Sequence, residues 1–181
     1  MILEKIYFEL SKNMDDEYYV ELAEKEFLVI PVMIDIMFSE NDHSHWAELL
    51  LEKISAKNPC SVYPFFEYIT EKVKEGETFL RWNIWRIVAN LLPCDSRNLW
   101  SNVKGDYIKA LSSTQIAEFS IAYDCAEKII KAEPEDMEEI LAVLVDATRR
   151  DFKIDDVVSP QCGEVAKEKV KLLLETLNNI E

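Results

Sequence analysis

Glycine is scarce in this chain, with three residues among 181. Loops that cradle phosphate groups need closely spaced glycines, because the backbone must approach the ligand without interference from a Cβ atom. The sequence holds no such loop, and it also lacks the Gly-x-Ser-x-Gly and His-Glu-x-x-His patterns of hydrolases and zinc proteases. We therefore expect a protein that is not an enzyme and that binds no cofactor.

Long apolar runs are lacking too. The longest, residues 27–38, contains Asp35, so it is too short and too charged to cross a bilayer. The first residues carry Glu4 and Lys5 within their apolar pattern, which is unlike a secretion signal. These features predict a chain that makes no contact with a membrane.

Basic residues are outnumbered by acidic ones, with 20 Lys and Arg against 35 Asp and Glu and a formal net charge of −15. Affinity for nucleic acid depends largely on Lys and Arg neutralising phosphates. An excess of negative charge repels polyanions. The charge of the whole chain therefore argues against DNA, RNA or an anionic membrane as the main partner.

The cysteines are few and far apart: Cys60, Cys94, Cys125 and Cys162. They form no Cys-x-x-Cys pair and no zinc-binding spacing. This pattern predicts reduced thiols in a cytoplasmic protein, where disulfides are rare.

The two histidines, His43 and His45, lie next to Asp42 and one turn before Glu48. His45 and Glu48 are three residues apart and can share a helix face. A metal site requires three or four convergent ligands with supporting residues around them, and no further histidine completes a set. Capping of a helix by Asp42 or Ser44 explains the segment more simply. We expect no metal site.

Residues that favour helix, such as Leu, Ile, Ala, Glu and Lys, are abundant. No long run alternates apolar and polar residues as a strand does. The chain also contains no flexible linker or low-complexity segment. We expect one all-α domain spanning residues 1–181.

The apolar pattern repeats when residues 46–74 are laid over residues 80–108, and a period of this size is typical of stacked helical repeats. The register continues in both directions, with Pro64 falling on Pro31 towards the N-terminus and Pro93 falling on Pro134 towards the C-terminus, where the offset is longer. The matched positions are apolar or proline: Leu50 with Ile84, Leu51 with Trp85, Ile54 with Val88, Pro59 with Pro93, Phe65 with Leu99, Phe66 with Trp100, and Ile69 with Val103.

The breaks in this pattern predict pairs of antiparallel helices. Asp95 is placed to cap the helix that follows it, and residues 151–159 have the composition of a loop. The expected pairs are 16–24 with 27–38, 45–57 with 61–74, 78–92 with 95–111, and 113–132 with 135–150, preceded by a helix at 2–12 and followed by one at 160–179.

Three details of the pattern resemble HEAT repeats, within the wider group of armadillo-like superhelices. These are the turn at Asn58-Pro59, the early prolines Pro31 and Pro64 in second helices, and Arg81 at the start of the next pair. The resemblance covers about residues 15–150. It implies a right-handed α-α superhelix, that is, a HEAT-like solenoid of about four helix pairs with a C-terminal capping helix. It does not identify a partner, because this fold hosts many unrelated roles.

The middle of the chain is locally basic. Residues 78–117 hold five basic and two acidic residues, together with three of the four tryptophans. Trp and Arg are the residue types that dominate binding hot spots. Trp85 and Trp100 align with apolar positions of the neighbouring pair, which favours the core for both. The residues that we expect to contact a partner are Trp82, Arg86, Arg97, Trp100, Lys104 and Arg149.

Two functions follow as hypotheses. The first is a non-enzymatic interaction module or scaffold that binds a peptide or protein partner along the face formed by the second helices. The alternative resembles the HEAT-type alkylpurine DNA glycosylases, which use a basic concave face, tryptophans and a carboxylate. No motif of that family maps onto the chain, and its charge departs from what a duplex requires. The residues available for the alternative are Trp82, Trp85, Arg86, Arg149, Arg150 and Asp151.

Overall fold

The computed structural model describes residues 16–39, 42–75 and 78–178, with the side chains of 72–82 and 178 outside that description. The helix expected at residues 2–12 lies outside the described residues. The chain divides into two compact units, Met1–Ser96 and Arg97–Glu181, here called unit 1 and unit 2. The single domain that the sequence predicts over residues 1–181 stays a prediction.

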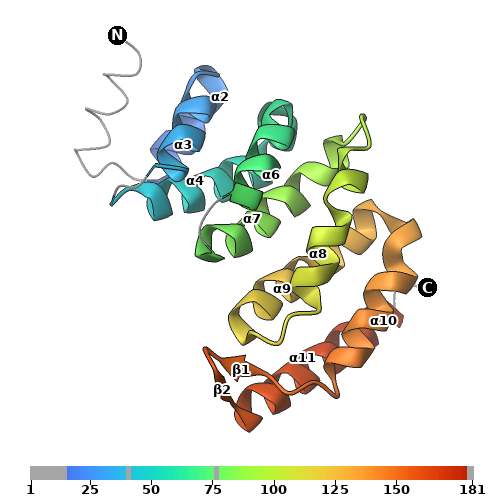
Figure 1. The fold of residues 1–181 in the computed structure, drawn as a ribbon. Helices are drawn as coiled ribbons and strands as arrows, with labels where there is room; N and C mark the ends of the chain where they lie inside the picture. The colour runs from blue at the N-terminus through green and yellow to red at the C-terminus, as the bar shows by residue number, and fades with distance from the viewer. Residues whose placement is uncertain (1–15, 40–41, 76–77, 179–181) are drawn as a thin grey trace. The chain divides into compact units, whose positions relative to one another are not determined.

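The described chain is mostly helical, which confirms the all-α expectation at that level (Figure 1). Short 3₁₀ segments separate several of the α-helices. Unit 1 contains α2 (Asp16–Lys25), α3 (Val29–Met37), α4 (Ser44–Lys57), α5 (Pro59–Val62), η1 (Tyr63–Phe65), α6 (Phe66–Glu75), α7 (Thr78–Leu91) and η2 (Leu92–Cys94). Unit 2 contains η3 (Leu99–Asn102), α8 (Lys104–Leu111), α9 (Ile116–Ala132), η4 (Pro134–Asp136), α10 (Met137–Ala147), β1 (Lys153–Ile154), β2 (Val157–Val158) and α11 (Pro160–Asn178).

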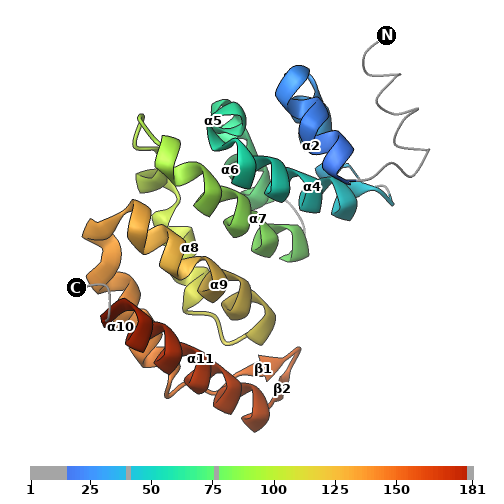
Figure 2. The ribbon, with the colours of Figure 1, turned by 180° about the vertical axis from the view of Figure 1, so that it is seen from behind.

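The core of unit 1 is centred on α4, which packs against α2, α3 and α7 (Figure 2). The buried side chains of α4 recur at helical spacing, with Leu50, Leu51 and Ile54 almost fully excluded from solvent. A polar contact accompanies this packing, because the amide Nδ2 of Asn90 on α7 donates to Ser55 Oγ at 2.8 Å. The apolar pattern that revealed the repeat is therefore the pattern that forms this core.

Two of the expected second helices are interrupted. The helix expected at 61–74 is divided by η1, which contains Pro64. The helix expected at 95–111 begins only at Lys104, and Asp95 does not cap it. Asp95 instead ends η2 and accepts a hydrogen bond from Tyr63, while Asn98 adopts a left-handed conformation with φ of 53°. A continuous right-handed helix cannot pass through a left-handed residue.

The core of unit 2 is rich in aromatic side chains. Trp100, Tyr107 and Phe119 are buried, and Phe119 packs against Phe152 with 4.7 Å between ring centroids. The hydroxyl of Tyr107 donates to the carbonyl oxygen of Ala122 on α9 at 3.0 Å. Within this unit α8 packs on α9, and α11 packs on α9 and α10.

Residues 153–158 form a β-hairpin where the sequence predicted a loop. The strands pair antiparallel, with Ile154 opposite Val157. Asp155 in the turn has φ of 52°, a conformation that Asp tolerates better than most residues. The backbone N–H of Lys153 also donates to the carbonyl of Thr114 at 2.8 Å, so the hairpin is tied to the loop before α9.

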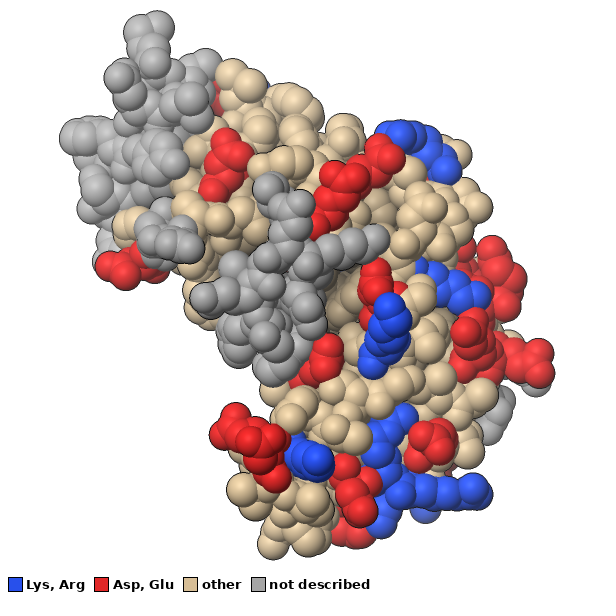
Figure 3. All heavy atoms as spheres, viewed as in Figure 1, with Lys and Arg blue, Asp and Glu red and all other residues tan. Residues whose placement is uncertain are grey.

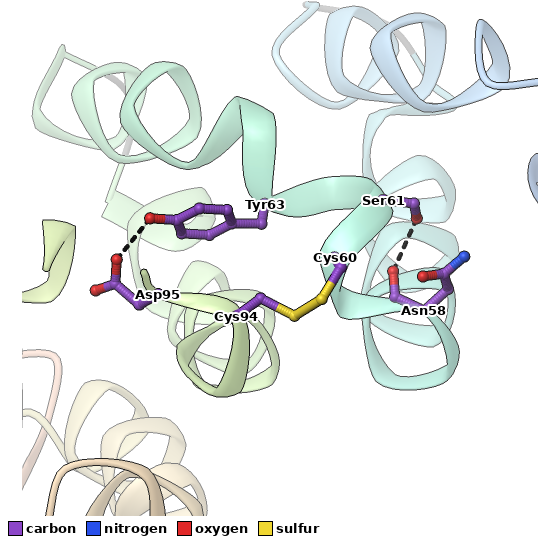
Figure 4. Close-up of a disulfide and its surroundings, with 6 residues drawn as sticks. All are labelled: Asn58, Cys60, Ser61, Tyr63, Cys94 and Asp95. Atoms are coloured by element: carbon purple, nitrogen blue, oxygen red, sulfur yellow. Dashed lines mark hydrogen bonds between the residues drawn. A yellow bond between two sulfur atoms is a disulfide. The ribbon is translucent and has the colours of Figure 1, made fainter. Parts of the chain in front are cut away.

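The expectation of four reduced thiols is wrong for two of them, because Cys60 and Cys94 form a disulfide with 5.5 Å between their Cα atoms (Figure 4). These two residues hold equivalent positions in the repeat, and the packing of α4 on α7 brings the equivalent turns together. Cys125 is buried and Cys162 is half-buried, and neither is part of a disulfide. Among the described residues, no helix is long and apolar enough to cross a membrane.

Candidate functional site

The six residues expected to contact a partner fall in both units. Trp82 and Arg86 belong to α7 in unit 1, and the side chain of Trp82 lies outside the described part of the structure. The other residues, Arg97, Trp100, Lys104 and Arg149, belong to unit 2.

Arg86 makes an ion pair in unit 1. Its Nη1 atom lies 3.8 Å from Glu52 Oε2, and both side chains are about one-third exposed. Glu52 belongs to α4, so the pair lies across the interface between α4 and α7. A partly exposed ion pair of this kind contributes little to the stability of the fold. It does orient the guanidinium towards the neighbouring helix of its own unit.

Trp100 and Lys104 converge on one carboxylate in unit 2. The indole Nε1 of Trp100 donates to Asp136 Oδ2 at 2.7 Å, and the ammonium of Lys104 donates to Asp136 Oδ1 at 2.5 Å. Lys104 also pairs with Glu139 Oε2 at 2.7 Å. The hydrogen bonds to Asp136 and Glu139 raise the pKa of Lys104 above its usual range. We call Trp100, Lys104, Asp136 and Glu139 the Asp136 cluster.

The Asp136 cluster limits what these residues can offer to a partner. The side chain of Trp100 is 2% exposed, which confirms the core interpretation of this tryptophan. Trp85 is buried as well. Lys104 is partly exposed, but two carboxylates hold its ammonium. The contacts of Trp100 and Lys104 favour a structural role, in which they hold η3 and α8 against η4 and α10.

Arg97 and Arg149 are exposed residues of unit 2. Arg150, the neighbour of Arg149, differs because its side chain is only 10% exposed. The Arg150 guanidinium lies 5.8 Å from the ring centroids of both Phe119 and Phe152, and it donates to the carbonyl of Leu111 at 2.9 Å. The Arg150 side chain thus packs against the aromatic core of unit 2, and its guanidinium also pairs with Asp146.

The alternative DNA-binding function finds little support in these positions. Trp85 and Arg150 are enclosed by the fold, and Arg86 is paired with Glu52. On the face seen in Figure 3, acidic and basic side chains of the described residues are interspersed. A duplex requires a surface on which basic residues dominate.

The histidine segment is explained by a contact between His45 and Glu48. His45 Nδ1 lies 3.2 Å from Glu48 Oε2, as their spacing on a helix predicts. Glu48 is only 2% exposed, and its Oε1 atom has no hydrogen-bond partner in the described part of the chain. Burial raises the pKa of the Glu48 carboxyl, an effect that the hydrogen bond from His45 partly offsets. No group of three metal-binding side chains occurs among the described residues.

The expected cap of this helix is not present. The N-cap position of α4 is occupied by His43, and no side chain of the described residues makes a capping hydrogen bond there. Neither Asp42 nor Ser44 has the role that the sequence suggested. Because Ser44 is already the first residue of α4, its conformation is helical and unsuited to an N-cap.

Sequence reasoning missed a set of exposed aliphatic side chains in unit 2, here called the apolar surface. It consists of exposed side chains on the hairpin and on α11: Ile154, Val157, Val158, Val165 and Leu172. Val157 is 71% exposed and Leu172 is 65% exposed. Figures 1 and 2 both show the hairpin beside the N-terminal end of α11. Val165 and Leu172 are two helical turns apart on α11, outside the stripe of residues that it buries. This spacing was the signal in the sequence that could have predicted an exposed apolar face.

A groove between α9 and α11 adjoins this surface. It has a volume of about 200 Å³ and is lined mainly by apolar side chains, with Gln161 and Lys169 among its polar residues. Val165 contributes to the groove and belongs to the apolar surface. Lys169 lies 3.7 Å from Asp124 and above the ring of Tyr123. The groove is therefore lined mainly by apolar atoms, and the charged residue at its edge, Lys169, is already paired with Asp124.

No family model, curated protein or solved structure gives a significant match to this chain. The resemblance to HEAT repeats therefore rests on the sequence pattern alone. The contacts and the exposure of side chains within each unit therefore distinguish the protein-binding hypothesis from the DNA-binding one.

Proposed function

We propose that the chain is a non-enzymatic protein-binding module with a HEAT-like superhelical fold. The observation that supports it best is the apolar surface of unit 2, where five large aliphatic side chains are about half exposed or more. A contiguous patch of exposed apolar side chains marks an interaction site on a monomeric protein, and Val165 belongs both to this surface and to the groove. The adjoining groove between α9 and α11 suits the apolar face of an amphipathic helix from a partner.

This proposal relocates the binding surface from the one expected first. The second-helix face of unit 2 includes α8 and α10, where Trp100 and Lys104 belong to the Asp136 cluster. The apolar surface lies on the hairpin and α11 instead. Arg97 and Arg149 remain exposed candidates for contacts, but they lie in turns outside α8 and α10.

A capture experiment with matched variants tests the proposal. The full chain is tagged and used as bait in lysate from its source cells, and retained proteins are quantified by mass spectrometry. We expect a partner that wild type retains and that V165E/L172E loses at least about tenfold, the scale of a hot-spot contact. Circular dichroism must show that the variant is folded.

Two further variants make the result specific. Lys171→Glu changes the net charge as much as V165E/L172E does, at an exposed position of the same helix, and should retain the partner. Loss of the partner with R97E/R149E, but not with V165E/L172E, would place the contact at Arg97 or Arg149 and overturn the proposed surface. If no protein is enriched by wild type over the variants, the proposal fails.

A further inference from the structure

The disulfide between Cys60 and Cys94 joins two turns that follow the two central helices of unit 1. Cys60 lies directly after Asn58-Pro59, where α4 ends, and Cys94 lies at the end of η2 after α7. The two cysteines are 34 residues apart in sequence. The bond thus fastens the end of α4 to the end of α7.

One residue of the bonded pair lies at the surface, where a dissolved thiol can approach it. Cys60 is an exposed residue and Cys94 a half-buried one. Thiol–disulfide exchange requires access of a thiolate to one of the sulfurs, and exposed disulfides are the ones that exchange readily. The other two cysteines differ, since Cys125 is buried and Cys162 belongs to unit 2.

The surrounding contacts do not depend on the bond. The hydroxyl of Tyr63 donates to Asp95 Oδ1 at 2.7 Å, which links the same two turns beside the disulfide (Figure 4). Further along, Asn90 Nδ2 on α7 donates to the carbonyl oxygen of Glu52 on α4 at 3.1 Å. The apolar packing of α4 on α7 adds to both. These contacts would hold the two thiols near each other after reduction.

We propose that Cys60 and Cys94 form a reversible exchange site within the folded chain: a small thiol such as glutathione reduces the bond, and the oxidised disulfide of that thiol reforms it. This inference is independent of the proposed binding function. The incoming thiolate attacks Sγ of Cys60, the more exposed residue of the pair, and forms a mixed disulfide as Cys94 leaves as a thiolate. A second thiol then attacks the mixed disulfide. The Cys60 thiol is released, two molecules of the reductant are oxidised to their disulfide, and two protein thiols result.

The test uses the oxidised full chain in native buffer with mixtures of reduced and oxidised glutathione. Samples are quenched in acid, alkylated with a maleimide and mapped by peptide mass spectrometry, while circular dichroism follows the helices. We expect Cys60 and Cys94 to become alkylated together as reduced glutathione increases, and to reform their bond when oxidised glutathione is added. The helical signal should stay within the scatter of replicate spectra, since the other contacts of α4 and α7 remain. Mixed disulfides trapped early should be on Cys60.

Two controls make the result decisive. Cys162→Ser should leave the exchange of Cys60 and Cys94 unchanged, since Cys162 takes no part in it. C60S/C94S should fold at room temperature without the bond. The proposal is overturned if that variant is unfolded, or if the native chain is reduced only at its unfolding rate whatever the glutathione concentration. Alkylation of Cys60 and Cys94 before any reductant is added would overturn it as well.

Discussion

Asp136 accepts a hydrogen bond from the buried indole of Trp100 at 2.7 Å, although the two residues are 36 positions apart in sequence. Asp136 is itself only 7% exposed. A carboxylate in such a place requires hydrogen bonds or an opposite charge to offset the loss of water. Trp100 supplies a hydrogen bond, and Lys104 supplies the charge.

Lys104→Met should destabilise unit 2 by about 1–3 kcal/mol, because it leaves the carboxylate of Asp136 without its cation. Urea unfolding followed by tryptophan fluorescence measures the change. Lys109→Met is the matched control, since Lys109 is exposed and pairs with Asp106 on its own helix. Equal stability of the two variants would show that the Asp136 cluster has no structural role.

C60S/C94S should unfold at lower denaturant concentration than oxidised wild type. Closing a loop of 34 residues is expected to stabilise the folded state by roughly 3–4 kcal/mol, through restriction of the unfolded chain. Wild type treated with dithiothreitol should match the variant in guanidinium unfolding. If reduction leaves the unfolding curve of wild type in place, the bond does not stabilise unit 1.

Glu48→Gln should stabilise the protein at pH 7 by on the order of 1 kcal/mol, since it removes a buried charge. Burial raises the folded-state pKa of Glu48 above its unfolded value of 4.5. Glu48 therefore favours folding fully below pH 4.5, and this contribution is lost as pH rises through the folded-state pKa. The melting temperatures of variant and wild type should converge towards pH 4. A difference that does not depend on pH would contradict this account.

Arg150→Met should destabilise unit 2 by about 1–3 kcal/mol, because the carbonyl oxygens of Leu111 and Ser113 lose their donor. Arg149→Met is the control, since Arg149 is exposed, and it should change stability by less than about 0.5 kcal/mol. Thermal unfolding by circular dichroism compares the two. If Arg150 served nucleic acid instead, its substitution would leave the melting temperature unchanged.

The helices themselves could be predicted because their signature is local. Both edges expected for α4, and the C-terminal edges expected for α2 and α7, lie within one residue of those observed. The spacing of Leu50, Leu51 and Ile54 predicted the buried face of α4. Local periodicity failed where a tertiary contact determined the conformation, as at Asp95, whose carboxylate accepts a hydrogen bond from Tyr63.

For the expected binding residues too, the local sequence was informative and the tertiary contacts were not predictable. Composition identified Trp100 and Lys104 as unusual, but it could not distinguish exposed residues from paired ones. Their common partner, Asp136, lies far along the chain from both, on the other side of α9. The valines of the hairpin were passed over because a strand of two residues is too short to show a period.

The sequence alone determined the helical composition, the repeat and the stripes that become the core, since each depends on residues within a few turns of one another. The tertiary structure decided which cysteines pair, which charges are neutralised within the fold and which apolar side chains remain in water. Cys60 and Cys94 show why. The repeat in the sequence shows that they hold equivalent positions. Their bond forms because the packing of α4 on α7 brings their Cα atoms to 5.5 Å from each other.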